Sequence, residues 1–221
     1  EQSNKSEKLE ELVVATDDER IAQKVREFGG NVMMTSPNHL SGTDRCAEII
    51  SLMKAEGKHF DLAVNIQGDE PEIDPQQIDL VVEGFNKPQV QIATLARAIS
   101  SGVQLLNRNV VKVIVTGEGR AIYFSRHAIP YQKNEAVEHW VKNFMYFQHI
   151  GIYAYRTDIL EQIAQLAPGK LEQAESLEQL RWIENGFYIY VKETEIDSRA
   201  VDTPDDLLKF TTSIENTRTN L

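Results

Sequence analysis

Short apolar runs of strand length alternate with helical patterns in the first half of this sequence, and that alternation limits the possible folds more than any other feature. Residues 12–16 and 62–66 are apolar runs, and the second is nearly continuous, as is typical of strands buried on both faces of a parallel sheet. Residues 19–28 place apolar side chains at helical spacing and are followed by two glycines. Further helical patterns begin near Thr43 and at Pro75. This order predicts a doubly wound, mostly parallel α/β sheet.

The middle of the chain has a different pattern, because strand-like segments follow one another directly. These segments are residues 91–98, 110–115, 121–125 and 149–156. The turn between the second and the third contains Gly117 and Gly119, as a hairpin requires. We therefore expect an antiparallel insertion at about 95–155. Helical patterns follow at 157–166, 174–185 and 204–214. Since the sequence has no internal repeat and no linker-like stretch, residues 1–221 are expected to form a single domain.

The charge balance and the single cysteine exclude several classes of protein. The chain has 23 basic and 34 acidic side chains and a net charge of -11, whereas binding to nucleic acid or to anionic membranes needs a basic surface. No apolar run in the sequence approaches the roughly 20 residues that span a bilayer. Cys46 cannot form an internal disulfide, which favours a reducing compartment. We expect a cytoplasmic protein that binds neither nucleic acid nor membrane.

Two carboxylates are candidates for binding a metal ion. Asp69 lies just past the carboxyl end of the predicted strand 62–66, where ligands bind in open α/β sheets. Such a carboxylate suits Mg²⁺ with substrate phosphates, although an isolated Gly-Asp pair is more often only a turn. Near the C-terminus, Thr203, Pro204 and Asp206 fit the capping of a helix, which leaves Asp202 unexplained. Asp202 is therefore a candidate for the second metal carboxylate.

The loop before the helix at Thr43 is a candidate nucleotide-binding segment. Backbone N–H groups at a helix start attract anions, and Ser41, Thr43 and Arg45 could add hydroxyl and guanidinium donors. The spacing fits Thr43 as a plain N-cap equally well.

Three more segments carry polar side chains at strand ends or on helices. Arg126 could bind a carboxylate through two hydrogen bonds, and His149 with Tyr153 could bind sugar hydroxyls. Taken singly, each of them fits a surface ion pair or an internally satisfied histidine better. Glu178 and Gln179 lie off the apolar face of their helix and are expected to face solvent.

The sequence contains no P-loop, no metalloprotease motif, no nucleophile elbow and no convincing catalytic triad. The chemistry that remains needs only a metal ion, positioning and charge neutralisation. Phosphoryl-type transfer fits that description.

The order and spacing of these segments resemble the 3-deoxy-manno-octulosonate cytidylyltransferases, the CMP-Kdo synthetase family. The resemblance runs from Leu12 to about Leu208 and rests on the joint order of its motifs, none of which is decisive alone. The matching segments are residues 14–18, 34–36, 41–45, 65–71, 111–113, 123–126, 129–130, 149–155, 177–181 and 201–204.

The resemblance implies an α/β fold of the nucleotide-diphospho-sugar transferase type, in a homodimer that uses the antiparallel insertion at its interface. It implies that CTP and Kdo react with Mg²⁺ to give CMP-Kdo and pyrophosphate, in the pathway to lipopolysaccharide. Asp69 and Asp202 match the Mg²⁺ carboxylates of the family. The remaining positions that the resemblance assigns are Gln67, Arg126, His149, Tyr153, Glu178 and Gln179 in the Kdo pocket, and Ser41, Gly42, Thr43 and Arg45 in the CTP pocket.

One departure concerns the beginning of the chain. The family begins with a strand and a loop rich in Arg, Ser, Gly and Lys that binds the triphosphate, and nothing before Leu12 matches it. Because the sequence also begins without Met, we expect that the natural N-terminus is missing and that a true fragment would be nearly inactive and unstable. The alternatives are a cytidylyltransferase for 8-amino-Kdo or sialic acid, and a non-catalytic nucleotide-binding module.

Overall fold

The computed structural model describes residues 2–197, 201, 203, 207–208 and 210–212. Its strands are β1 (Val14–Thr16), β2 (Val32–Met34), β3 (Leu62–Asn65), β4 (Ile92–Ala98), β5 (Lys112–Val115), β6 (Ala121–Ser125), β7 (Phe147–Arg156) and β8 (Ile189–Glu193). Its α-helices are α1 (Glu19–Glu27), α2 (Gly42–Ala55), α3 (Pro75–Glu83), α4 (Gly102–Leu106), α5 (Trp140–Asn143), α6 (Thr157–Ile163), α7 (Lys170–Glu175) and α8 (Gln179–Glu184). Short 3-10 turns are η1 (Ser3–Lys5), η2 (Gly84–Asn86) and η3 (Val137–His139). None of the described helices is long and apolar enough to cross a membrane.

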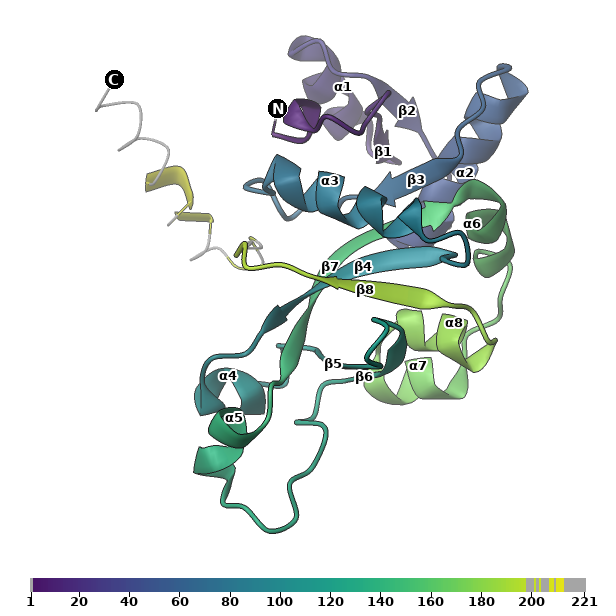
Figure 1. The fold of residues 1–221 in the computed structure, drawn as a ribbon. Coiled ribbons are helices and arrows are strands. Elements are labelled where there is room, and N and C mark those ends of the chain that lie inside the picture. Colours follow the sequence, from purple (N-terminus) through teal and green to yellow (C-terminus); the bar gives the residue numbers. More distant parts are fainter. Residues whose placement is uncertain (1, 198–200, 202, 204–206, 209, 213–221) are drawn as a thin grey trace.

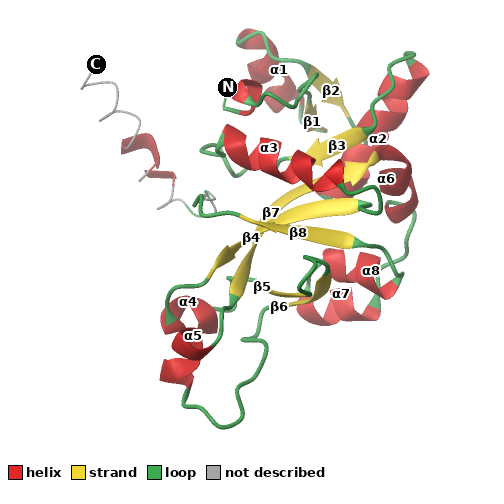
Figure 2. Cartoon of the chain, viewed as in Figure 1, coloured by secondary structure: helices red, strands yellow, loops and turns green. Residues whose placement is uncertain are grey.

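The α/β class is confirmed, and in the six-stranded sheet two strands, β6 and β7, run against the other four (Figures 1 and 2). β7 pairs antiparallel with both β3 and β4, and β4 pairs parallel with β8. β3, β4 and β8 therefore share one direction, and the reversed β7 lies between β3 and β4. The predicted hairpin is present, since β5 and β6 pair antiparallel. β5 also pairs antiparallel with β7, which joins the hairpin to the sheet.

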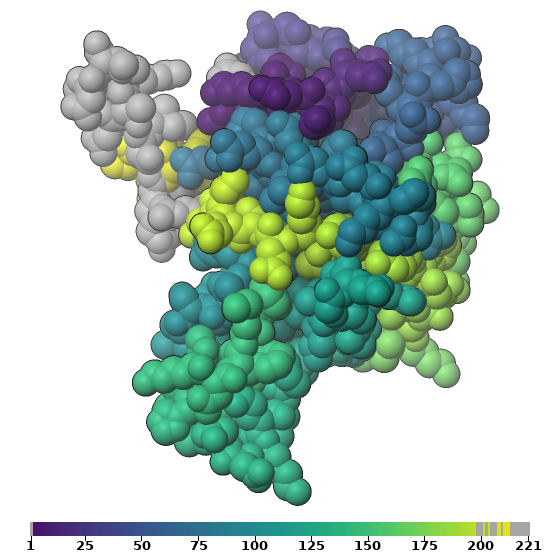
Figure 3. Space-filling view, viewed as in Figure 1, coloured from purple at the N-terminus to yellow at the C-terminus, as the bar shows by residue number. Residues whose placement is uncertain are grey.

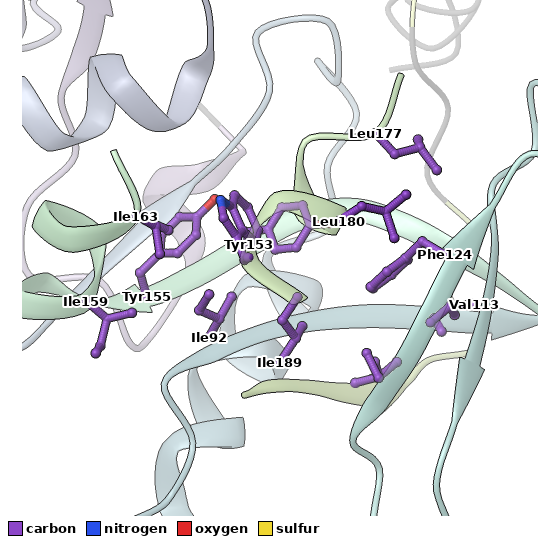
Figure 4. Close-up of a cluster of buried hydrophobic side chains, with 14 of the residues drawn as sticks. Ile92, Val113, Phe124, Tyr153, Tyr155, Ile159, Ile163, Leu177, Leu180 and Ile189 are labelled. Carbon is purple, nitrogen blue, oxygen red and sulfur yellow. The ribbon is translucent and has the colours of Figure 1, made fainter. Parts of the chain in front are cut away.

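Side chains alternate across β4 and build a core on each face of the sheet. Ile92 belongs to a cluster with residues of α6 and α8, which includes Tyr155 and Trp182 (Figure 4). Ala93 belongs to a second cluster with residues of α3, such as Ile78. Helices thus cover both faces, as a doubly wound sheet requires.

A third, smaller cluster holds together the part of the insertion that projects from the sheet, where α4 and α5 lie (Figure 1). It contains Leu105, Trp140 and Tyr146 with their neighbours. The stretch between β6 and β7, where the sequence analysis expects no helix, includes α5. The sequence analysis did not predict α4.

The predicted helix over 174–185 is wrong, because the structure has two shorter helices there. Ser176 adopts a left-handed conformation with φ 52° and ends α7. Leu177 then enters the core, and α8 begins two residues later. The predicted closing helix at 204–214 lies largely outside the described residues.

The pair β1–β2 shares no hydrogen-bonded strand with the six-stranded sheet among the described residues. A cavity of about 320 Å³ is lined by residues of both β1 and β3, including Ala15 and Val64. Apolar side chains of α2, such as Ile49 and Met53, also line it. β1, which pairs only with β2 among the described strands, and β3, which pairs only with β7, therefore border one slot, and charged side chains such as Lys8 and Asp61 also line it.

Candidate active site

The N-terminus of α2 lies against the carboxyl end of β3. Ser41 is the N-cap, since its hydroxyl accepts a 3.1 Å hydrogen bond from the backbone N–H of Asp44. A Cβ on Gly42 would lie 3.1 Å from the side-chain nitrogen of Asn65, so glycine permits this close approach. Asn65 is buried at the end of β3 and stands opposite Tyr153 of β7. Ser41 therefore takes the capping role for which Thr43 was an equal candidate.

Thr43 instead connects α2 to the start of α8. Its hydroxyl donates a 2.9 Å hydrogen bond to the Glu178 carboxylate. Burial raises the pKa of Glu178, and the hydroxyls of Thr43 and Ser41 oppose that rise. The next residue, Gln179, is only 6% exposed. The expectation that Glu178 and Gln179 face solvent is wrong, because the first turn of α8 lies against the N-terminus of α2.

Three aromatic side chains pack together beside Thr43 and Glu178. The rings of Tyr153 and Tyr155 stack with centroids 6.0 Å apart, and Trp182 meets Tyr153 edge-on at 5.1 Å. Figure 4 shows both tyrosines projecting from β7 into the core. Among the described residues, the buried hydroxyl of Tyr153 and the Trp182 indole N–H have no hydrogen-bond partner. Buried polar atoms are normally paired, so these two mark a place for a polar ligand or a water molecule.

His149 lies at the other side of Tyr153. The two ring centroids are 5.2 Å apart, and Phe124 meets the imidazole edge-on at 5.1 Å. The imidazole Nε2 is 2.9 Å from the hydroxyl of Thr94. Burial lowers the pKa of His149 to about 3. The ring is therefore neutral at physiological pH and acts through hydrogen bonds rather than through charge.

The loop after β3 brings together segments that are distant in sequence. Gln67 and Asp69 are exposed, and the Asp69 carbonyl accepts a 2.7 Å hydrogen bond from the backbone N–H of Val201. A Cβ on Gly151 of β7 would lie 3.8 Å from a carboxylate oxygen of Glu70. The predicted metal ligand Asp202 lies outside the described residues. Val201, the residue before Asp202, is nevertheless hydrogen-bonded to the loop that carries Asp69.

The donors at this loop fit Mg²⁺. No group of three or more His, Cys, Asp or Glu side chains with metal-binding geometry occurs in the described part of the chain. Mg²⁺ does not need one, since it typically binds one or two carboxylates and completes its shell with water and phosphate oxygens. The exposed carboxylate of Asp69, at the carboxyl end of β3, is a donor of that kind.

Arg126 lies beside the turn that joins α7 to α8. Its Nε donates to the Glu175 carbonyl at 2.8 Å and its Nη2 to the Ser176 carbonyl at 3.1 Å. Its Nη1 is 3.4 Å from the Arg108 carbonyl. A guanidinium has five N–H groups, so one remains on each Nη nitrogen for a further acceptor.

Arg45 is engaged elsewhere. Its guanidinium forms an ion pair with Asp17 at 3.0 Å and donates to the Thr35 hydroxyl at 2.5 Å. These partners follow β1 and β2, so Arg45 ties the ends of those strands to α2. The structure thus brings Gly42, Thr43, Tyr153, His149 and Glu178 around one place and holds Arg45 at the neighbouring strand pair.

Several residues of this region were missed by the sequence analysis as site residues. Asn65, Thr94 and Trp182 all touch the residues described above. A signal exists for the first two, because Asn65 directly follows three apolar residues of its strand and Thr94 lies within the otherwise apolar run 92–96. Trp182 gives no such signal, since it fits an ordinary core position of α8.

Comparison with known proteins identifies the family. The family model described as "Cytidylyltransferase" matches residues 1–196. A 3-deoxy-manno-octulosonate cytidylyltransferase from Cytophaga hutchinsonii is 50% identical over 92% of this chain and 80% of its own length. The chain belongs to the 3-deoxy-manno-octulosonate cytidylyltransferase family. A second member, from Phocaeicola vulgatus, is 48% identical over 91% of this chain and 80% of its own length.

Solved structures agree with the family assignment. A CMP:2-keto-3-deoxy-manno-octonic acid synthetase complexed with CTP matches with a TM-score of 0.87 and 38% identity, over 98% of this chain and 85% of the other. HddC from Yersinia pseudotuberculosis matches with a TM-score of 0.60 at 10% identity, over 94% of this chain and 80% of the other, and shows a shared fold alone. The predicted family, its fold type and the nucleotidyltransferase class are confirmed.

Proposed function

We propose that this member of the 3-deoxy-manno-octulosonate cytidylyltransferase family transfers the cytidylyl group of CTP to Kdo, giving CMP-Kdo and pyrophosphate for lipopolysaccharide synthesis. The observation that carries the proposal is the cluster of polar side chains Tyr153, His149, Glu178 and Gln179, of which Tyr153 and Gln179 are buried and the other two half-buried. These are the positions that the family resemblance assigns to the sugar acid. The names of the relatives and the CTP complex of the similar structure support the same reaction.

In the proposed reaction, the anomeric 2-hydroxyl of Kdo attacks the α-phosphorus of CTP in line. A bond forms from that oxygen to phosphorus, the bond to the β-phosphate oxygen breaks, the hydroxyl loses its proton, and pyrophosphate leaves. The chain's residues bind and orient the reactants. His149 and Tyr153 bind sugar hydroxyls, and the two remaining Nη N–H groups of Arg126 bind the sugar carboxylate. Ser41, Gly42, Thr43 and Arg45 are proposed to hold part of CTP.

Mg²⁺ is the proposed cofactor, with Asp69 and Asp202 as its protein ligands. When bound, it would neutralise charge on the phosphate oxygens and lower the pKa of a coordinated hydroxyl. The exposed position of Asp69 supports this role.

We further propose a homodimer in the cytoplasm. The insertion exposes large apolar side chains, including Val103 (85%), Tyr131 (73%) and Met145 (61%). The lobe that carries them projects from the body of the molecule (Figure 3). Exposed apolar patches mark protein–protein interfaces, and several exposed apolar side chains on one projecting lobe support that role. Light scattering after gel filtration should give twice the 25.1 kDa chain mass, and Met145→Asp with Val103→Asp should give the monomer.

The reaction is tested by pyrophosphate release from CTP, with and without Kdo and with and without Mg²⁺. Release that needs both additions supports the proposal. CTP and Kdo binding are measured beside turnover by calorimetry, so that substrate binding and reaction are distinguished. A signal with 8-amino-Kdo or a sialic acid in place of Kdo would change the substrate. CTP binding without turnover on any of these acids favours a nucleotide-binding module.

A further inference from the structure

The hydroxyl of Thr94 lies at the centre of a group of polar atoms from β7. It is fully buried and lies 2.8 Å from the carbonyl of Ile152, 3.2 Å from the carbonyl of Ile150 and 2.9 Å from Nε2 of His149. The strand register shifts here, since Thr94 pairs with Tyr153 whereas the next residue of β4 pairs with Ile150. The Thr94 hydroxyl thus lies where the pairing of β4 with β7 is irregular, and there it contacts two β7 carbonyls and His149.

A hydroxyl carries one proton, and that limits how these contacts can be made. Both carbonyl oxygens can only accept. If the Thr94 proton pointed at His149, both carbonyls would face a bare oxygen at 2.8 and 3.2 Å. The proton therefore belongs on the shorter contact, to Ile152. The hydrogen between Thr94 and His149 must then come from the imidazole, with Nε2–H as donor.

The second ring nitrogen has the opposite role. The imidazole lies among aromatic rings, and no described acidic side chain forms an ion pair with it. A neutral ring with its proton on Nε2 carries a lone pair on Nδ1. Among the described residues, Nδ1 of His149 has no hydrogen-bond partner.

We propose that Thr94 is a positioning residue whose buried hydroxyl fixes His149 as the Nε2–H tautomer, so that Nδ1 accepts a hydrogen bond from a substrate hydroxyl. This rests on the proposed function in one respect, namely that His149 contacts the sugar acid. Nδ1 of His149 would recognise a substrate hydroxyl that donates a hydrogen bond. The tautomer itself does not depend on the substrate, so it can be tested on the protein alone.

The tautomer can be measured without turnover. Long-range ¹H–¹⁵N correlation spectra of the ¹⁵N-labelled protein distinguish protonated from unprotonated ring nitrogens, and His149→Gln assigns the signal among the five histidines. Near neutral pH we expect Nε2 protonated and Nδ1 unprotonated. Thr94→Val should move the Nδ1 signal toward exchange between tautomers, whereas Thr94→Ser should keep the original pattern. Protonated Nδ1 in the unmodified protein overturns the proposal, and so does an unchanged spectrum in Thr94→Val.

Kinetics test the consequence for the substrate. Loss of one oriented hydrogen bond should raise KM for Kdo about tenfold in Thr94→Val and leave KM for CTP unchanged. Thr94→Ser should restore KM for Kdo, which a general packing defect would not allow. If Thr94→Val does not fold, the unmodified protein and Thr94→Ser still decide the tautomer. Absence of Kdo-dependent turnover in the unmodified protein counts against the proposed function, and the spectra still decide the role of Thr94.

Discussion

Thr43 and Glu178 are 135 residues apart in sequence and are joined by a 2.9 Å hydrogen bond from hydroxyl to carboxylate. The bond holds the first turn of α2 against the start of α8. Thr43→Val would leave a half-buried carboxylate with one donor fewer, so the free energy of unfolding should fall by about 1–2 kcal/mol. Urea unfolding measures the change. Thr212→Val, which removes an exposed hydroxyl bonded to the Leu208 carbonyl, is the control, and equal losses in both variants would contradict this role.

The partly buried imidazole of His149 predicts a pH dependence of stability. Burial lowers its pKa from 6.5 to about 3, so below pH 6.5 the unfolded chain binds a proton that the folded chain does not. The contribution to stability is complete above pH 6.5 and is lost as the pH falls toward 3. Compared with His149→Gln, the unmodified protein should lose up to about 1.4 kcal/mol more per pH unit in that range. Urea unfolding between neutral pH and about pH 5 tests this, and parallel curves for the two proteins would rule it out.

Lys112 is completely buried and uses its ammonium group to bind three backbone carbonyls. The Nζ atom lies 2.9 Å from the Asn107 carbonyl and 2.6 Å from those of Val110 and Arg126. Lys112→Met would leave these acceptors without a donor, so we expect a loss of about 3 kcal/mol or more in the free energy of unfolding. Lys133→Met, at an exposed lysine, should change it little. A similarly small loss at Lys112 would show that solvent replaces the ammonium.

The single cysteine should be unreactive in the folded protein. Burial, with a smaller contribution from the charge of Glu178, raises the pKa of the Cys46 thiol to about 12 from 9.0. The thiolate fraction at mildly alkaline pH falls by about a thousandfold, and alkylation slows with it. Iodoacetamide labelling followed by mass spectrometry should modify the protein only in denaturant. Rapid labelling without denaturant would show that Cys46 is accessible and ionised.

Asp69 should matter for turnover and not for folding. Its side chain is exposed, so Asp69→Asn should leave the thermal midpoint nearly unchanged. If it ligates Mg²⁺ as proposed, kcat should fall about 100-fold or more, and the Mg²⁺ concentration needed for half-maximal rate should rise. Glu72→Gln, at an exposed carboxylate in the same loop, is the matched control. Equal rates for Asp69→Asn and the unmodified protein would remove Asp69 from the metal site.

Local patterns predicted most of the secondary structure, because strand length and helical spacing record which side chains are buried. The segment at 174–185 shows where they fail. Its apolar residues have helical spacing, yet Leu177 is buried through a break at Ser176 and not through a continuous helix. Spacing alone does not distinguish these two ways of burying the same residues.

The candidate site was predicted through family resemblance and hardly through single residues. Taken alone, Glu178 was expected in solvent, since its position on the helix lies off the apolar face. It is half-buried because Thr43, far away in sequence, lies against it. Such pairings depend on the tertiary arrangement, and the spacing of residues within one helix does not contain them.

The slot between β1 and β3 has a consequence for solvent exchange. Each strand borders the slot with an edge that no described strand pairs with, and a backbone amide without a strand partner exchanges its hydrogen rapidly. Amides on the slot-facing edges of β1 and β3 should therefore exchange faster than those of β4, which is paired on both sides. An extended segment that paired with both β1 and β3 in the slot would protect the amides of both edges from exchange. It would also join the β1–β2 pair to the six-stranded sheet, so that the two would unfold together.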